Sequence, residues 1–389
     1  MSTATPIKVI DADSHLTEPP DLWINRLPAK WKDEGPRTLI DPATGFQRWR
    51  LGDRWLSGIG AQSHAGWSNF PPSRPTSFDA IDIQCYDAVE RAKWMDEHGV
   101  AVQVLYPNLV AFEGHAIMAL PDAGLQLAII KAYNDYQTDF AAQAPGRYIP
   151  IAALPFWDLD ESIAEMNRCA AMGHRGVLWA ATLAKHGLPP TTDPYWDPFY
   201  AAAQDAQMSI NLHVGVGMTE DEVIEVSGRN HAFEIRGQTG RTALSFMSNA
   251  KTITDLIMSG VLDRFPKLNF VSVESGFGWL PFLLEGLDWQ WRNYDGPRVI
   301  GGLLPSELFR RQIYGMFWFE ESSLRLFDLY PDNVMFETDF PHTTSLSPGP
   351  GSASPSARTI VENARKVLDP VTFEKVMYSN AARVYRIGS

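Results

Sequence analysis

The chain has 389 residues, of which 45% are apolar and 20% charged, and its formal charge at pH 7 is −13. A chain of this length and apolar content can bury a large core without staples or a partner. The acidic balance, with no cluster of lysine and arginine, argues against nucleic-acid binding. The only two cysteines, Cys85 and Cys169, fall in predicted helices and exclude a disulfide framework or a cysteine-based zinc cluster.

The N-terminal stretch MSTATPIKVIDADSH lacks the charged region and uninterrupted apolar segment of a secretory signal. No run of eighteen apolar residues occurs in the sequence, so no membrane-spanning helix is expected. We therefore expect a cytoplasmic protein with no membrane partner.

Short aliphatic runs alternate with longer amphipathic stretches along the chain, which is typical of a parallel sheet wrapped by helices. Strands are predicted at 8–11, 101–106, 148–153, 176–179, 209–213, 269–273, 312–317 and 333–337. Helices are predicted at 85–99, 122–144 and 158–173, with Gly99 and Gly173 as stop signals. Eight such strands predict a single (β/α)8 TIM-type barrel domain over residues 1–389.

A barrel of this kind needs only about 250 residues, so the chain must carry insertions. The longest, residues 17–84, follows the first strand and contains a predicted β-hairpin within 46–60, around Gly52-Asp53. A second long connection, 214–240, follows the fifth strand, and a loop rich in serine, proline and glycine (345–357) follows the eighth. Loops after barrel strands lie on the catalytic face, so insertion 17–84 is expected to act as a lid or as an interface.

Ionisable side chains gather at the ends of four predicted strands: Asp11, Asp13 and His15; His213; Glu274; Glu337, Asp339 and His342. Side chains two positions apart in a strand point to the same side, so Asp13 and His15 can both face the barrel axis. Carboxylate oxygen and imidazole nitrogen together suit a divalent transition metal. The pattern predicts a metal site at the carboxyl ends of the strands.

Five motifs, in order, make the sequence similar to a known family: IDADSHLTEPPDLW, INLHVG, VSVESGFGWLPFLLEGLD, FETDFPH and SNAARVY. With these motifs the chain resembles the aminocarboxymuconate-semialdehyde decarboxylase-like branch of the amidohydrolase superfamily over nearly its whole length. The resemblance implies a barrel with a divalent metal, zinc or manganese above all. It also implies hydrolysis or non-oxidative decarboxylation of a small carboxylated or cyclic molecule, and a homo-oligomer, since relatives are commonly dimers or larger.

Carried over residue by residue, the family's metal ligands fall on Asp13, His15, His213 and Asp339, and Asp339 is also the expected proton-transfer group. Two positions depart from the family. Asp13 stands where histidine is common, and Glu274, followed by Ser275, stands where many relatives carry a catalytic histidine. Glu274 is therefore expected either to bind metal and take part in catalysis, or to orient a ligand histidine from outside the coordination shell.

Three further histidines are predicted to contact substrate, namely His342, His231 and His115. An aromatic pocket lining is expected from Trp23, Trp67, Phe70, Phe112 and Trp179, any of which would equally serve in the core. Glu337 is interpreted as structural. For Asp11 the sequence leaves two readings open, a deeper position on the same face as Asp13 or the satisfaction of nearby backbone donors.

The leading hypothesis is a metal-dependent hydrolase or decarboxylase. The alternative is a dinuclear iron or iron–manganese oxygenase on the same barrel, because Asp13 and Glu274 make the site rich in oxygen, Glu274 could bridge two metals, and His231 could add a ligand. A non-catalytic scaffold ranks third, because burying unpaired carboxylates without a metal is costly.

Overall fold

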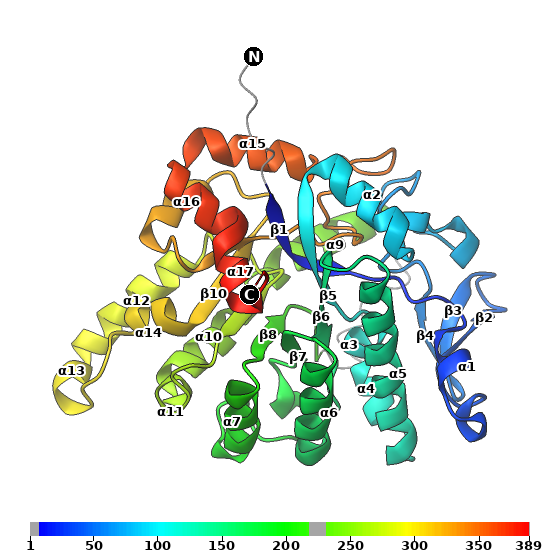
Figure 1. Cartoon of the computed structure of the whole chain (residues 1–389), viewed down its shortest axis with the longest axis horizontal. Helices are drawn as coiled ribbons and strands as arrows, with labels where there is room; N and C mark the ends of the chain where they lie inside the picture. Colours follow the sequence, from blue (N-terminus) through cyan, green and yellow to red (C-terminus); the bar gives the residue numbers. More distant parts are fainter. Residues whose placement is uncertain (1–7, 218–230, 389) are drawn as a thin grey trace.

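The structure is a computed structural model that describes residues 8–217 and 231–388, apart from the side chains of 231–234. Eight parallel strands lie side by side in chain order and form a nearly closed barrel surrounded by helices (Figure 1). The strands are β1 (Val9–His15), β5 (Val100–Tyr106), β6 (Tyr148–Ala152), β7 (Gly176–Trp179), β8 (Ser209–His213), β9 (Phe270–Val273), β10 (Ile313–Phe317) and β11 (Val334–Phe336). The predicted (β/α)8 barrel is confirmed.

The first and last strands meet through the segment that follows β11, and this closes the barrel. The Asp339 amide donates to the carbonyl of Asp13 at 2.9 Å, and the His15 amide donates to that of Phe340 at 2.6 Å. Below them, the Asp11 carboxylate accepts from the amide and the hydroxyl of Thr338 at 2.7 and 2.6 Å, and from the Gln103 amide group at 2.9 Å. Asp11 thus links β1 to the segment after β11. Of the two interpretations that the sequence left open, this is the second, in which Asp11 satisfies nearby backbone donors.

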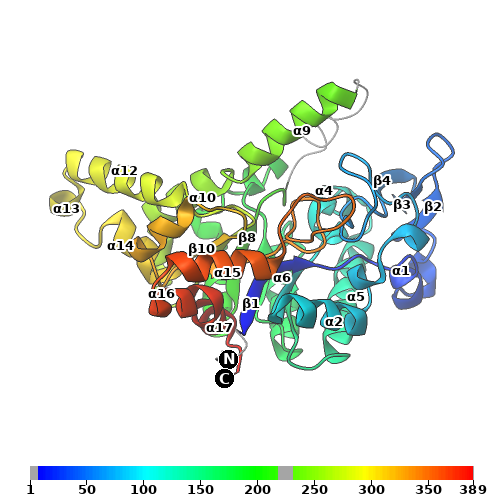
Figure 2. The same cartoon turned by 90° about the horizontal axis from the view of Figure 1, so that it is seen from above.

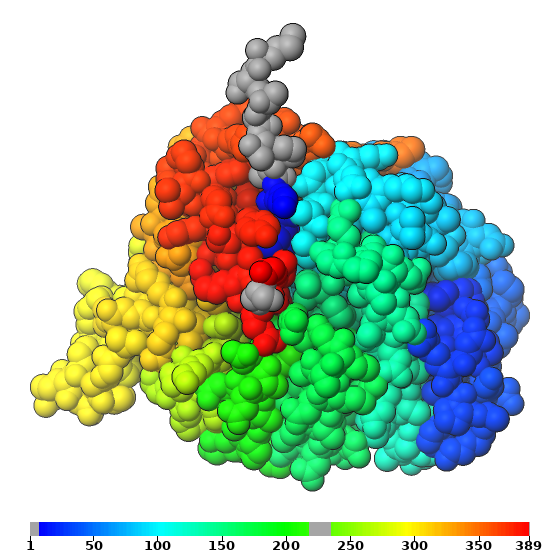
Figure 3. Space-filling view, viewed as in Figure 1, coloured from blue at the N-terminus to red at the C-terminus, as the bar shows by residue number. Residues whose placement is uncertain are grey.

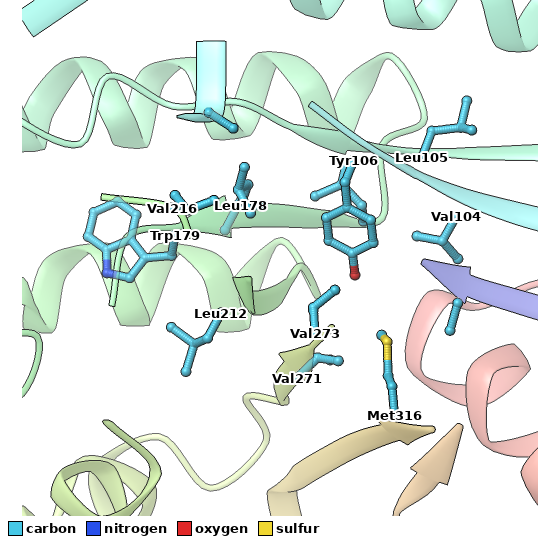
Figure 4. Packing of buried hydrophobic residues seen from close by; sticks show 14 of the residues in the cluster. Val104, Leu105, Tyr106, Leu178, Trp179, Leu212, Val216, Val271, Val273 and Met316 are labelled. Carbon is cyan, nitrogen blue, oxygen red and sulfur yellow. The ribbon is translucent and has the colours of Figure 1, made fainter. Parts of the chain in front are cut away.

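The barrel interior is filled by side chains of the strands and of the C-terminal helix. Strand residues such as Val271, Val273 and Met316 pack there together with Tyr106 (Figure 4). The hydroxyls of Tyr106 and Tyr385 lie 2.9 Å apart, and each donates to the Asn211 side-chain oxygen at 3.0 Å. The barrel is therefore a packed core rather than a pore, and its floor holds the residues above it in place.

The helices begin where the sequence supplies capping residues. The carboxylates of Asp87, Asp122 and Asp158 accept from the free amides at the starts of α2, α5 and α6. The helices are α1 (Leu22–Arg26), α2 (Ala88–His98), α3 (Leu109–Phe112), α4 (Gly114–Met118), α5 (Ala123–Ala142), α6 (Leu159–Ala171), α7 (Asp197–Asp205), α9 (His231–Ser245), α10 (Asn249–Met258), α11 (Val261–Arg264), α12 (Leu280–Asn293), α13 (Gly296–Val299), α14 (Pro305–Gln312), α15 (Ala357–Val367), α16 (Pro370–Glu374) and α17 (Asn380–Tyr385).

Short 3₁₀ and π turns complete the helical elements: Ala29–Trp31, Phe78–Ala80, Ile83–Cys85, Leu183–His186, Pro194–Trp196 and Ser323–Leu329, with a π turn at Lys375–Ser379. The predicted helix 85–99 is shorter than expected, because Asp87 caps a new helix at Ala88. Cys85 consequently ends a 3₁₀ turn, which corrects its predicted place in the helix, whereas Cys169 lies in α6. Gly99, at φ 80°, ends α2 as predicted.

The insertion after β1 carries a small antiparallel sheet of its own, made of β2 (Arg37–Ile40), β3 (Gln47–Leu51) and β4 (Arg54–Gly58). The predicted hairpin within 46–60 is confirmed as β3 and β4. β2 was not predicted, since its half-exposed residues show little alternation. In Figure 2 this sheet and α9 rise from the same side of the barrel.

Within the described residues, none of the helices is both long enough and apolar enough to cross a membrane. Two helical segments extend beyond the barrel. α9 rises away from the body in Figure 2, and the hairpin of α12 and α13 forms a protrusion at one side of the molecule in Figures 1 and 3.

Candidate metal centre and its cavity

The carboxyl ends of β1, β8, β9 and β11 meet at one point and bring the predicted ligands together. β1 extends to His15, four residues beyond its predicted end, so Asp13 and His15 alternate within a continuous strand and face the same side. β8 ends at His213, and Asp339 follows β11. All four side chains are fully or almost fully buried.

The ligand atoms of these residues lie within a few ångströms of one another. Nε2 of His15 is 3.0 Å from Nε2 of His213, 3.4 Å from Oδ1 of Asp13 and 3.7 Å from Oδ1 of Asp339. Oδ2 of Asp13 is 3.6 Å from Nε2 of His213. Two groups are compact enough to hold a cation: Asp13, His15 and His213; and His15, Asp339 and His342.

The two histidines of this cluster are neutral and therefore offer it few hydrogen-bond donors. Nδ1 of His213 donates to the Val214 carbonyl at 2.7 Å, so its Nε2 presents a lone pair. Burial lowers the pKa of His213 to about 4 and sets that of His15, which is also close to His342 and His213, well below its ordinary value. Both rings are therefore neutral near pH 7, and at most one N–H points into the cluster.

Asp13 is the ligand whose two carboxylate oxygens both lack a hydrogen-bond partner among the described residues. Both of these oxygens are buried. Burial, with Glu337, Asp339 and Glu274 nearby, raises the pKa of Asp13 well above its ordinary value. Buried acidic groups without donors are costly to the fold, and a divalent cation among these atoms removes that cost. The donor set of two carboxylates and two neutral imidazoles fits such an ion.

Glu274 lies beside the cluster rather than in either compact ligand group. Its Oε2 is 3.8 Å from Nδ1 of His213, the ring nitrogen that faces away from the cluster, and its amide donates to Glu337 at 3.2 Å. Burial, then the charge of Asp339, raises the pKa of Glu274 well above its usual range. Glu274 (φ 50°) and Asp339 (φ 55°) both adopt the left-handed backbone region, which costs about 1–3 kcal/mol per residue and is concentrated at functional sites.

His342 is held against the cluster by a directional chain of hydrogen bonds. The Asn108 amide nitrogen donates to the Leu16 carbonyl at 2.7 Å, so its oxygen accepts from Nε2 of His342 at 2.8 Å. Nδ1 of His342 lies 2.8 Å from Oδ1 of Asp339. The ring also stacks on that of His15, with centroids 3.8 Å apart.

A cavity of about 590 Å³ lies over the cluster. Glu274, His342 and Thr344 line it from the barrel side. The insertion contributes lining residues between Thr17 and Arg74, and α9 contributes lining residues between Ile235 and Ser245. Of the aromatic residues predicted to line the pocket, only Phe112 does so. Trp23 and Trp179 lie in the core, whereas Trp67 is half-buried and Phe70 is exposed, both outside the lining.

Of the other two predicted substrate contacts, one lies away from the cavity and one is outside the described side chains. His115 lies in α4, half-buried and outside the cavity lining. His231 begins α9, but its side chain is outside the described residues. Glu337 is fully buried beneath Glu274, and its pKa is raised strongly by burial and by the neighbouring carboxylates of Asp339 and Glu274.

Two residues of the site escaped the sequence analysis, namely Thr344 and Asn108, and Glu18, which the sequence suggested only as a loop-fixing residue, also reaches the cavity. The Thr344 hydroxyl contacts Oδ2 of Asp339 and lies 3.2 Å from Oε1 of Glu274. Glu18 accepts from the Leu109 amide at 2.8 Å and lines the cavity. The available signal was position, since Asn108 and Thr344 follow strand ends by two and eight residues.

The model of the amidohydrolase family matches residues 10–387. The gamma-resorcylate decarboxylase of Rhizobium sp. is 26% identical over 262 residues, which cover 64% of this chain and 76% of that enzyme. The structure of an amidohydrolase from Mycobacterium avium subsp. paratuberculosis aligns with a TM-score of 0.72, 19% identity and coverage of 98% and 100%. A dihydroxybenzoic acid decarboxylase from Polaromonas, with bound manganese and the inhibitor 2-nitroresorcinol, aligns with a TM-score of 0.62, 19% identity and 98% coverage of both chains.

Proposed function

Because this chain belongs to the amidohydrolase family, we propose that it is a metal-dependent, non-oxidative decarboxylase of a small aromatic carboxylic acid. The observation that carries the proposal is Asp13, whose two buried oxygens accept no hydrogen bond from the described residues and lie close to two neutral histidines. The neighbouring Glu274 and His342 line the cavity. Asp13, His15, His213 and Asp339 would hold one divalent ion. Manganese is favoured over zinc, since a related decarboxylase binds it and the ligand set is rich in oxygen.

A bound divalent ion would hold the oxygen atoms of the substrate and withdraw electron density from its ring. Residues of the chain donate and replace the proton that the reaction consumes. Asp339, in contact with Nδ1 of His342 and with the Thr344 hydroxyl, lies where it can deliver a proton to the ring carbon that carries the carboxylate. The carbon–carboxyl bond then breaks, its electron pair returns to the ring, and carbon dioxide leaves. His342 returns a proton to Asp339, so the net reaction consumes one proton from solvent.

The cavity supports an anionic, planar substrate. Arg74 and Arg241 both line it, and no ion pair of either guanidinium is found among the described residues. Burial, followed by the nearby charge of Arg48, lowers the pKa of Arg74, so pairing with an anion would stabilise it. The volume of about 590 Å³ lies within the range for small-molecule sites. Residues of the insertion line this cavity, which supports a lid role for 17–84.

Decarboxylation is favoured over the other hypotheses by the relatives. Those described above act as decarboxylases or belong to the amidohydrolases, and none of them is described as an oxygenase. Hydrolysis uses the same ligands and stays the second candidate, with a metal-bound water as nucleophile. The compact group of Asp13, His15 and His213 offers three protein ligands and leaves room for either chemistry.

A substrate panel separates these reactions. The purified chain, loaded with manganese, would be offered hydroxylated benzoic acids, including 2,6-dihydroxybenzoate, together with matched amides and esters. We expect release of carbon dioxide from at least one acid and no turnover of the amides or esters. Hydrolysis of an amide or ester, with every acid left intact and the metal bound, would replace the proposal with the hydrolase alternative.

A further inference from the structure

The turn that joins β9 to α12, residues 274–279, carries Glu274 to the wall of the cavity. Glu274 adopts φ 50°, in a backbone region that is unfavourable for glutamate. Its amide donates to Glu337 at 3.2 Å, which fixes the first residue of the turn. A strained conformation of this kind persists only where the surrounding structure holds it, so the far end of the turn also needs an anchor.

Glu320, which follows β10 by three residues, provides that anchor. Its Oε1 accepts from the amides of Phe277 and Gly278, both at 2.9 Å, and from the Ser323 hydroxyl at 2.8 Å. The two amides belong to the turn and not to α12, which begins at Leu280. Glu320 therefore binds the turn itself rather than capping the helix.

Two glycines let the backbone of the turn pack directly against this carboxyl group. Gly276 has φ 65°, and an added Cβ there would lie 3.2 Å from Oε1 and 3.3 Å from Cδ of Glu320. An added Cβ at Gly278 would lie 2.7 Å from the hydroxyl oxygen of Ser323. A side chain at either position would displace Glu320 or its partner, so the sequence of the turn is matched to the position of Glu320.

The carboxyl group of Glu320 occupies this position although its burial is unfavourable. Burial raises the pKa of Glu320, and its Oε2 is buried without a hydrogen-bond partner among the described residues. A carboxylate accepts hydrogen bonds from amides roughly twice as strongly as a neutral group does. The position therefore exchanges solvation of the carboxyl group for a firm hold on the turn.

Glu274 in turn lies close to the proton donor of the proposed function. The Thr344 hydroxyl has one hydrogen and contacts both Oε1 of Glu274 and Oδ2 of Asp339. Glu274 and Thr344 both line the cavity. A shift of Glu274 would therefore change the cavity wall beside Asp339 and leave the Thr344 hydroxyl with a single carboxylate partner.

We propose that Glu320 is a positioning residue, which holds the turn between β9 and α12 in the conformation that keeps Glu274 beside Thr344 in the cavity wall. The proposal deepens the proposed function and rests on it, because the position of Glu274 affects turnover only if the cavity is the active site. Without its two amide bonds to Glu320, the turn is free to leave the left-handed region, and the carboxyl group of Glu274 would move away from Thr344.

A double-mutant cycle tests this role in the manganese-loaded enzyme, on an acid that the wild type decarboxylates. E320A should lower kcat about tenfold or more with KM within about threefold of wild type, whereas E320Q, which keeps an acceptor oxygen, should retain most of the rate. E274A should also lower kcat, and E320A should then add less than about threefold in the E274A background. Losses that multiply in the double variant, or a wild-type kcat in E320A or E274A, would overturn the proposal.

Asp288 provides the matched control, since it also accepts from an amide and a hydroxyl, those of Ser306, at 2.9 and 2.8 Å. Those contacts lie at the start of α14, outside the cavity lining. D288A should leave kcat within about threefold of wild type, and an equal loss in D288A and E320A would overturn the proposal by showing general destabilisation. If E320A does not fold by circular dichroism, S323A removes one donor to Glu320 instead, with an expected loss of about threefold that disappears in the E274A background. Full activity of S323A would then overturn the proposal as well.

A crystal structure of E320A, or of S323A in its place, tests the same claim without turnover. Glu274 should leave the left-handed region and lose its contact with Thr344, and an unchanged conformation of the turn would overturn the positioning role. A displaced Glu274, together with a wild-type enzyme that binds manganese but decarboxylates no acid, would count against the proposed function alone.

Discussion

Replacing Thr344 with valine removes one hydroxyl from the wall of the candidate metal centre and leaves the shape of the side chain nearly unchanged. The hydroxyl contacts Oδ2 of Asp339 and lies 3.2 Å from Oε1 of Glu274. A hydrogen bond to a buried charged group contributes about 1.5–3 kcal/mol, which corresponds to roughly 10- to 150-fold in a binding constant. Loss of a hydrogen bond to a ligating carboxylate typically weakens metal binding by 10- to 100-fold. The two estimates agree, so we expect T344V to bind manganese about 10- to 100-fold more weakly.

Calorimetric titration of the metal-free protein with manganese measures this change. T344S is the matched control, because serine keeps the hydroxyl, and its affinity should stay within about threefold of wild type. The decarboxylation rate at saturating manganese shows whether the hydroxyl also fixes the proton donor. If T344V binds manganese as tightly as T344S does, then Asp339 is not oriented by this hydroxyl and the assignment of the second ligand group is wrong.

The remaining predictions concern the proton, the fold and pH. D339N should lose at least about 10³-fold in decarboxylation rate when manganese is supplied at a concentration that saturates Asp13 and the two histidines; a rate within tenfold of wild type would exclude Asp339 as proton donor. H342Q should lower the rate 10²-fold or more without lowering metal content, because it removes the ring nitrogen that lies 2.8 Å from Asp339 and would return a proton to it; unchanged kinetics would contradict this. D11L should lower the free energy of unfolding in urea by about 2–4 kcal/mol, since the amide and hydroxyl of Thr338 lose their buried acceptor; a loss below 1 kcal/mol would refute its role in closing the barrel. Burial raises the pKa of Glu18 from 4.5 to about 7, so the folded state binds its proton more tightly and stability falls as pH rises from 4.5 to 7. E18Q should therefore gain about 3 kcal/mol relative to wild type between pH 4.5 and pH 8, and parallel stability curves would show that Glu18 is not the group that titrates.

The barrel could be predicted because its signal is local and repeated. Each strand is a short aliphatic run, and the residues that end these runs are the ones that converge in space. Asp13, His15, His213 and Asp339 were identified in this way, since strands that are parallel place their carboxyl ends at the same edge. β2 escaped prediction because its residues are half-exposed and lack alternation.

The walls of the site were harder to predict because loops place them. Trp23 and Trp179 were candidates for the pocket on composition alone, yet both are fully buried in the core. Thr344 and Asn108 act through hydrogen bonds to Asp339 and His342, and a threonine or an asparagine in a loop carries no pattern that distinguishes such a role. Sequence spacing predicts which strand ends meet, but not how the loops fold back over them.

An anomalous diffraction map of crystals grown with manganese shows directly whether these side chains bind one metal ion. We predict one strong peak within about 2.3 Å of ligand atoms of Asp13, His15, His213 and Asp339. A map with no peak at this position, or with its manganese bound by other residues, would contradict it.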